Sequence, residues 1–266
     1  MNGARRVVYR RYISGYDKRT DLIDYMRRVI HSKNFEQFSG HETAASRAYV
    51  AIRDRILRCG LAPGAAVNER VIMKEISIGR TPIREALLRL SAEGLIIFSG
   101  QGIHVAPVTL KSISALYTAR LHAERLAWQL WLRAADRDQI ARLASAFDAA
   151  ATLAECDDEE GLVELDFRFH SQIYEECGNQ FLTSQLYNLT GLSFRVWFLA
   201  NPHQVDHHLL TVRSHDPIIE AVKARDAVRL DREVAEHISN AFHTVIERMK
   251  GNGVTMAAHL SMRLLQ

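Results

Sequence analysis

The sequence has few cysteines and no long apolar run. Its three cysteines, Cys59, Cys156 and Cys177, lie far apart among 266 residues. This excludes a disulfide framework and a CxxC zinc cluster. No segment reaches the roughly 20 apolar residues that a membrane helix needs. The start, MNGARRVVYRRY, lacks the apolar core of a secretory signal. We therefore expect a cytoplasmic protein with no membrane partner.

What the sequence does contain is typical of a folded globular protein, with 47% hydrophobic and 24% charged residues. The charge is uneven along the chain. Residues 1–45 and 46–108 each carry nine Lys/Arg against five Asp/Glu, whereas residues 109–266 carry sixteen against twenty-one. A basic N-terminal part before an acidic part is typical of a nucleic-acid binder with a separate partner domain, although a solvated surface would look similar.

Residues 1–45 form an N-terminal extension, with helical spacing of apolar residues only near 21–30. From residue 46 the pattern becomes regular. Helices are predicted at 46–56, at 70–76 and from Pro82 to Gly94, followed by short strands at 95–98 and 103–105. Three helices and a β-hairpin within residues 46–108 predict a winged helix-turn-helix, in which the third helix enters the major groove of DNA. A small α+β domain without DNA would give the same outline.

The local sequence favours DNA binding. The run GRTPIREALLRLSAEGLI, followed by SGQGIHVAPV, resembles the GntR family of bacterial transcription regulators, whose signature is similar to SRTPVREALRRLEAEGLV. The resemblance covers residues 46–108. One position differs, because Gly79 stands where the family usually has Ser or Thr. That hydroxyl would cap the recognition helix, so we expect a weaker cap here.

The resemblance implies which residues contact DNA. They are Arg70 on the second helix, Arg80, Thr81 and Arg84 at the start of the third, and Gly102 at the tip of the wing. Arg80 and Arg84 are four residues apart, so both guanidinium groups can face one groove. Glycine at the wing tip allows the backbone to approach the duplex.

From residue 109 onward the sequence shows no strand-like alternation. We predict an all-α bundle over residues 109–250 and a C-terminal tail at 251–266. A loop containing His203, His207 and His208 is predicted after Pro202. The helices are predicted at 116–132, 139–155, 162–177, 180–199, 214–224 and 227–250.

Four residues of this second domain could bind a metal. Asp166 and His170 are four residues apart on one predicted helix, beside its apolar stripe, while His215 and His237 lie on later helices. Three histidines and one carboxylate suit Zn²⁺, Ni²⁺ or Mn²⁺, with zinc as the default. Taken singly, each histidine is more often a hydrogen-bonded core or surface residue.

The same four residues match a second resemblance. The D-x3-H helix, the segment SHDPIIEAV and the later AEHI are similar to the FCD class of GntR regulators, the FadR-like branch, over roughly residues 110–250. This resemblance implies that the four residues are metal ligands. It also places Arg120 near the ligand pocket, where its guanidinium could bind a carboxylate. A surface salt bridge to Glu124 is the alternative. Arg195 is a weaker candidate of the same kind.

Together these features predict a homodimeric transcription regulator, most often a repressor in this class. It would bind a palindromic operator in double-stranded DNA under the control of a small organic acid held at the metal. Two alternatives remain open at this point. The metal could activate water in a hydrolase or isomerase. The protein could also respond to the metal itself.

Overall fold

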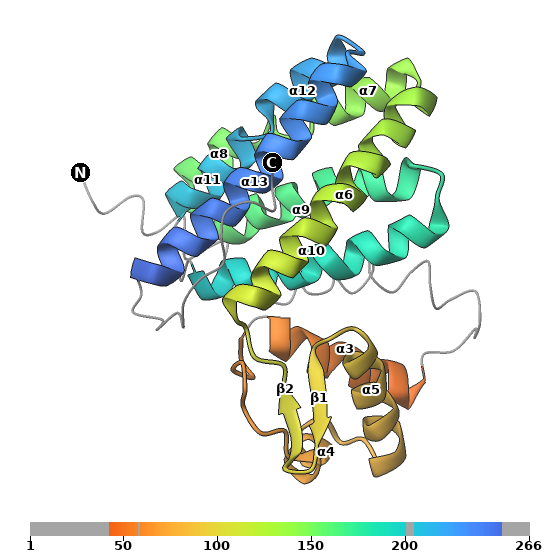
Figure 1. Cartoon of the computed structure of the whole chain (residues 1–266), viewed down its shortest axis with the longest axis vertical. Coiled ribbons are helices and arrows are strands. Elements are labelled where there is room, and N and C mark those ends of the chain that lie inside the picture. The colour runs from red at the N-terminus through yellow and green to blue at the C-terminus, as the bar shows by residue number, and fades with distance from the viewer. Residues whose placement is uncertain (1–42, 58, 201–204, 252–266) are drawn as a thin grey trace.

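The protein folds as two lobes, one of which is entirely helical (Figure 1). The computed structural model describes residues 43–57, 59–200 and 205–251. The helix predicted near residues 21–30, most of the predicted tail, and His203 lie outside these ranges.

The first lobe is the predicted winged helix-turn-helix. It contains helices α3 (Ala44–Leu57), α4 (Glu69–Ile76) and α5 (Arg80–Ala92) and strands β1 (Ile96–Ser99) and β2 (Gly102–Val105). The strands pair antiparallel, with Ile96 opposite Val105 and Ser99 opposite Gly102. The apolar spacing of the sequence explains the packing, since α3 and α5 contribute one buried stripe each. These stripes consist of Ala48, Tyr49, Ile52 and Ile56 on α3, and Ile83, Ala86, Leu87 and Leu90 on α5.

A side-chain cap marks the start of α4 but not that of α5. Asn68 caps α4, because its side chain accepts hydrogen bonds from the backbone N–H groups of Arg70 and Val71. The cap residue of α5 is Gly79, which makes no side-chain cap bond. The weaker cap expected from the sequence is therefore confirmed. A side chain would fit at this position, since a Cβ on Gly79 would meet nothing within 4 Å.

The second lobe is an all-α bundle, as predicted. Its first helix, α6, begins with a capping box in which Thr109 and Ser112 each bond the other's backbone N–H. Helix α13 packs along α6, and α10 packs against α6, α9 and α13. The helices are α6 (Leu110–Ala134), α7 (Arg137–Ala144), α8 (Ala150–Glu155), α9 (Glu159–Glu176), α10 (Gln180–Ala200), α11 (Val205–Arg213), α12 (Asp216–Lys223) and α13 (Ala227–Gly251).

Two predictions for this lobe were wrong. The single helix expected at 139–155 is divided into α7 and α8 by a series of turns at 145–149. The turns bury Phe147, whose ring lies 5.2 Å from that of His215 and 4.7 Å from that of Phe169. Tertiary packing of one aromatic residue thus outweighs the helical periodicity of the segment.

The loop expected after Pro202 was also wrong for most of its length. His207 and His208 belong to helix α11. This helix buries Val212 against the core of the bundle, and the carbonyl group of Val212 faces His215. Among residues 209–213 of this helix only Val212 is buried, and so short a helix leaves only a weak periodic signal in the sequence.

Helix α10 joins the two lobes. One side of it meets α3, where the Arg53 Nη2 atom lies 2.8 Å from the point that a Cβ on Gly191 would occupy. Leu192 packs on the core of the first lobe, and Arg195 Nη2 donates a 2.8 Å hydrogen bond to the carbonyl group of Ala106. Arg53 is held in turn by Glu93 at 3.0 Å. The absence of a side chain at position 191 therefore leaves room for the Arg53 guanidinium at the contact between the lobes.

We expect Gly191→Val to displace Arg53 from Glu93, because the new side chain needs the space that the guanidinium occupies. Overpacking of this kind typically costs ~1–3 kcal/mol. The free energy of unfolding, measured by urea titration, should fall by this amount. Phe181→Val is the matched control on the same helix, since Phe181 is 78% exposed and should change stability by less than about 0.5 kcal/mol. Equal stability of both variants would contradict the proposed contact.

Candidate metal centre and DNA interface

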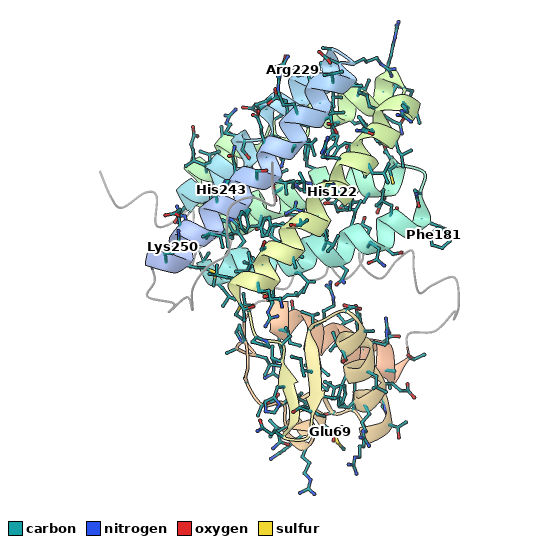
Figure 2. The ribbon with its side chains drawn as sticks, viewed as in Figure 1. Glu69, His122, Phe181, Arg229, His243 and Lys250 are labelled. Atoms are coloured by element: carbon teal, nitrogen blue, oxygen red, sulfur yellow. The ribbon has the colours of Figure 1, made fainter. Side chains whose placement is uncertain are left out.

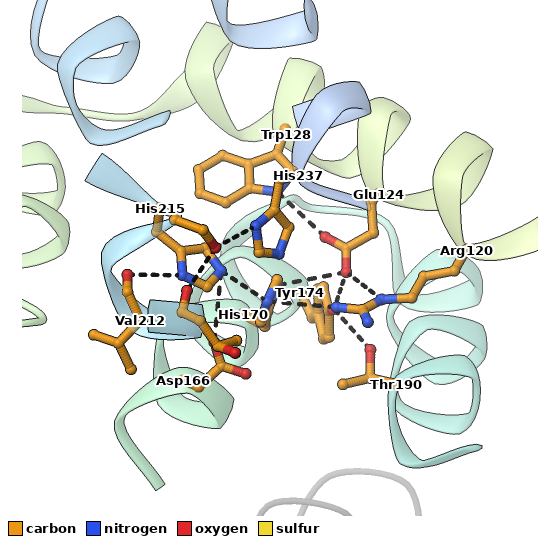
Figure 3. Close-up of polar contacts among 12 residues, drawn as sticks. Arg120, Glu124, Trp128, Asp166, His170, Tyr174, Thr190, Val212, His215 and His237 are labelled. Atoms are coloured by element: carbon orange, nitrogen blue, oxygen red, sulfur yellow. Dashed lines mark hydrogen bonds and ion pairs between the residues drawn. The ribbon is translucent and has the colours of Figure 1, made fainter. Parts of the chain in front are cut away.

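Three of the predicted metal ligands meet in the core of the bundle. His170 lies on α9, His215 immediately precedes α12, and His237 lies on α13. All three are buried, and a ligand nitrogen from each lies within 4.8 Å of the others. Asp166, one turn before His170, joins them, since its Oδ1 lies 3.6 Å from His215 Nε2 (Figure 3). The structure thus brings together all four residues.

Hydrogen bonds outside the cluster orient two of the imidazoles. His215 Nδ1 lies 3.1 Å from the Val212 carbonyl oxygen, which can only accept, so Nδ1 carries the proton. The Ser214 hydroxyl donates to the Thr211 carbonyl oxygen and therefore accepts from His237 Nδ1 at 3.0 Å. Both rings consequently keep an unprotonated Nε2. This is the tautomer that binds a metal.

The inner side of the cluster gathers acceptor atoms that a positive charge would stabilise. His170 Nε2 lies 3.2 Å from His215 Nε2, and a further acceptor, Asp166 Oδ1, is buried without a hydrogen-bond partner. A single proton between the two nitrogens would leave Asp166 uncompensated, whereas a divalent cation would satisfy all the acceptors. Burial lowers the pKa of His215 and of His237 well below the usual value and raises that of Asp166. The donor set therefore fits a divalent metal.

Arg120 lies beside this cluster and is buried. Its Nε bonds Glu124 Oε1 at 3.1 Å, and its Nη2 lies 3.4 Å from His170 Nε2. The salt bridge to Glu124 that the sequence suggested is present, but it is not on the surface, because Glu124 is fully buried. Burial alone would raise the pKa of Glu124. Its contacts with His170 and Arg120 hold this pKa below its usual range instead.

Glu124 is the residue of this site that sequence reasoning missed as a functional group. Its carboxylate lies 3.4 Å from His170 Nδ1 and accepts hydrogen bonds from Trp128 Nε1 and from the Tyr174 hydroxyl. It thus lies behind His170, where carboxylates commonly support metal-binding histidines. The available signal was its position four residues after Arg120 on a helix.

A cavity of about 330 Å³ opens from the cluster. Asp166, His170, His237 and Arg120 form one end of it, and most of the remaining wall is apolar. Arg195 does not line this cavity, in contrast to the expectation from the sequence. Its side chain points to the first lobe, where it binds the carbonyl group of Ala106. The physical reason is its place on the opposite side of α10 from Phe194 and Trp197.

The predicted DNA-contacting arginines of α5 are exposed and share one acidic partner. Arg84 Nε lies 3.4 Å from Glu69, and Arg80 Nη2 lies 3.9 Å from it. Glu69 was not identified from the sequence, although an acidic residue at the first position of α4 is a helix N-terminus signal. It lies at the end of the first lobe that faces away from the bundle (Figure 2). The arginines are thus presented to solvent at that end.

The other predicted contacts are accessible as well. Arg70, Thr81 and Gly102 are all exposed. Gly102 has a φ of 118°, a conformation that side chains rarely adopt, which explains glycine at the wing. The arrangement of helix, bracing helix and hairpin suits the major groove.

Comparison with known proteins agrees with both lobes. Residues 44–105 match the family described as bacterial regulatory proteins, gntR family, and residues 115–240 match the FCD domain. The chain belongs to the GntR family. Its FCD domain is consistent with the FadR-like branch of these regulators.

Individual relatives of this GntR-family chain are distant. It is 24% identical over 212 residues to the HTH-type transcriptional repressor GlaR of Escherichia coli, covering 77% of this chain and 96% of that protein. It is 23% identical to the gluconate operon transcriptional repressor of Bacillus licheniformis, covering 73% and 83% respectively. In fold it resembles Escherichia coli McbR/YncC, with a TM-score of 0.64, 18% identity and coverage of 77% and 98%.

The family and its relatives are transcription regulators, so the chain is not an enzyme. The hydrolase or isomerase alternative is therefore set aside. Among the described helices, none combines the length and the apolar character needed to cross a bilayer.

We expect His215→Ala to abolish stoichiometric metal binding, because it removes a ligand between two helices. Elemental analysis of zinc-equilibrated protein should show well below one metal per chain, and zinc should no longer raise the thermal midpoint. His243→Ala is the control, since His243 is exposed on α13, the helix that also carries His237 (Figure 2). One zinc per chain in the His215 variant would refute the assignment.

Proposed function

We propose that this GntR-family regulator is a homodimeric repressor whose binding to a palindromic operator is controlled by a small carboxylate held at a divalent metal. Support for repression comes from the names of the two curated relatives, which are both repressors. A two-fold dimer presents two recognition helices related by symmetry, and this requires a palindromic site.

The DNA-binding part of the proposal rests on the exposed face of α5. Arg80 and Arg84 are 68% and 58% exposed at their side chains, and both lie near Glu69. A carboxylate at this distance keeps the guanidinium groups in place before DNA arrives, without burying them. Arginine in this position can bind guanine through two parallel hydrogen bonds.

The metal part rests on the buried donor set of Asp166, His170, His215 and His237. When bound, a divalent metal such as zinc would act as a Lewis acid that accepts a carboxylate oxygen of the effector. Arg120 lines the same end of the cavity. Its guanidinium can therefore bind the second carboxylate oxygen while its Nε remains bonded to Glu124.

Coupling between cavity and DNA requires an element that contacts both, and α10 does so. Ser193, Phe194 and Trp197 line the cavity, whereas Gly191 and Arg195 meet the first lobe. A ligand that binds one position of α10 more tightly than another would shift the placement of the recognition helices. This two-sided helix is the observation that carries the proposal.

The test begins with an operator selected by the purified protein from random duplex DNA. Zinc-loaded protein on this operator is then titrated with a panel of small carboxylates, and release is followed by fluorescence anisotropy. Release by a carboxylate only in the presence of metal is the expected result. Release by zinc or by a chelator alone, with no effect of any carboxylate, would indicate a metal sensor and overturn the proposal.

Arg84→Ala should reduce the affinity for the selected operator, because a lost contact to a base costs ~1–3 kcal/mol. Metal content and dimerisation should not change, since Arg84 lies far from the bundle. Arg137→Ala, an exposed arginine on α7, serves as the charge-matched control. Footprinting that shows full operator specificity in the Arg84 variant would exclude a base contact.

Arg120→Lys tests whether the Arg120 guanidinium binds the effector carboxylate, with less disturbance of the site than Arg120→Ala would cause. Alanine would leave Glu124 buried without its partner, whereas lysine retains the charge and removes the planar guanidinium. Zinc content should stay at one per chain, while calorimetry should show carboxylate affinity about tenfold lower, equivalent to ~1.4 kcal/mol. Arg125→Lys is the control, because Arg125 pairs with Asp231 outside the cavity. Unchanged affinity in the Arg120 variant would place the effector elsewhere.

A further inference from the structure

The wall of the cavity is mostly apolar, in contrast to the polar end that carries the histidine cluster. Beyond that end, Arg248 is the only charged residue among the described residues that line it. Aromatic and aliphatic side chains form most of the wall. They are Tyr117, Leu162, Val163, Phe194, Trp197 and Leu210.

Two hydroxyl groups on the wall, those of Ser193 and Ser214, cannot donate to a ligand. Ser193 Oγ already donates to the Leu189 carbonyl oxygen, and Ser214 Oγ donates to the Thr211 carbonyl oxygen. A polyhydroxylated ligand would bury hydroxyl groups against apolar side chains and leave some of them without partners. Such burial is unfavourable, whereas burial of an apolar body is favourable.

The charge at the inner end matches a single carboxylate. A divalent cation beside Asp166 leaves one positive charge, because the neighbouring Arg120 and Glu124 neutralise each other. The volume of about 330 Å³ is at the lower end of the range for small-molecule pockets.

We propose that the effector is a small monocarboxylate with an apolar body, aromatic or aliphatic. This inference rests on the proposed function for where the carboxylate binds, whereas the apolar character of the rest of the ligand follows from the cavity wall. Sugar acids, which the name of the gluconate operon relative would suggest, are then poor ligands for this chain.

Three six-carbon acids test the proposal on zinc-loaded protein by calorimetry. Hexanoate has an apolar body, gluconate carries hydroxyl groups, and adipate carries a second carboxylate. Hexanoate should bind at least tenfold more tightly than either of the others. In the series from acetate to hexanoate, each added methylene should raise affinity by about fourfold until the cavity is filled. Quenching of Trp197 fluorescence, lost in Trp197→Phe, should report the same binding.

Val163→Thr should weaken the dependence of affinity on the chain length of the acid, because it replaces a methyl group of the cavity wall with a hydroxyl group of similar size. Val196→Thr is the matched control, since Val196 is buried on α10 but does not line the cavity. Tighter binding of gluconate or adipate would overturn the apolar monocarboxylate and leave the proposed function intact. If no acid binds, or if all bind equally after removal of zinc, the proposed function fails and the inference fails with it.

Discussion

The second lobe depends on one electrostatic constraint, which is the convergence of buried acceptor groups. The unprotonated Nε2 atoms of His215 and His237 and the carboxylate of Asp166 point toward the same small volume near His170. A positive charge among its members would stabilise such a group. Because these residues come from α9, the start of α12 and α13, a cation bound here would also tie the three elements together. The Val212 carbonyl group and the Ser214 hydroxyl orient the rings of His215 and His237 from outside the cluster.

Helix α10 connects this centre to the DNA-binding lobe. One side of this helix lines the cavity, and another side faces α3 and the residue Ala106 that follows β2. Glycine at position 191 admits the Arg53 guanidinium, which Glu93 holds on the other side. Helix α3 contacts α10 and packs directly on the recognition helix α5. The coupling in the proposed function therefore needs only the path from the cavity through α10 and α3 to α5.

The DNA face also brings charged groups together, but there they are exposed to solvent. Glu69 lies 3.4 Å from Arg84 and 3.9 Å from Arg80, and both guanidinium groups remain in solvent. Exposed ion pairs of this kind contribute little to stability. The recognition helix itself presents the two arginines, because its buried stripe of Ile83, Leu87 and Leu90 anchors it in the first lobe.

The sequence alone determined the parts of this protein that follow from local periodicity and from motif spacing. These include the three helices and hairpin, the all-α second lobe, and the placement of Asp166 beside His170, because residues four apart on one helix must share a face. Tertiary structure alone decided the division between α7 and α8, since Phe147 packs against residues distant in the chain. It also turned Arg195 toward the first lobe and buried the salt bridge of Arg120 with Glu124. Both outcomes depend on which neighbour covers a helix face, and no spacing within a single helix contains that information.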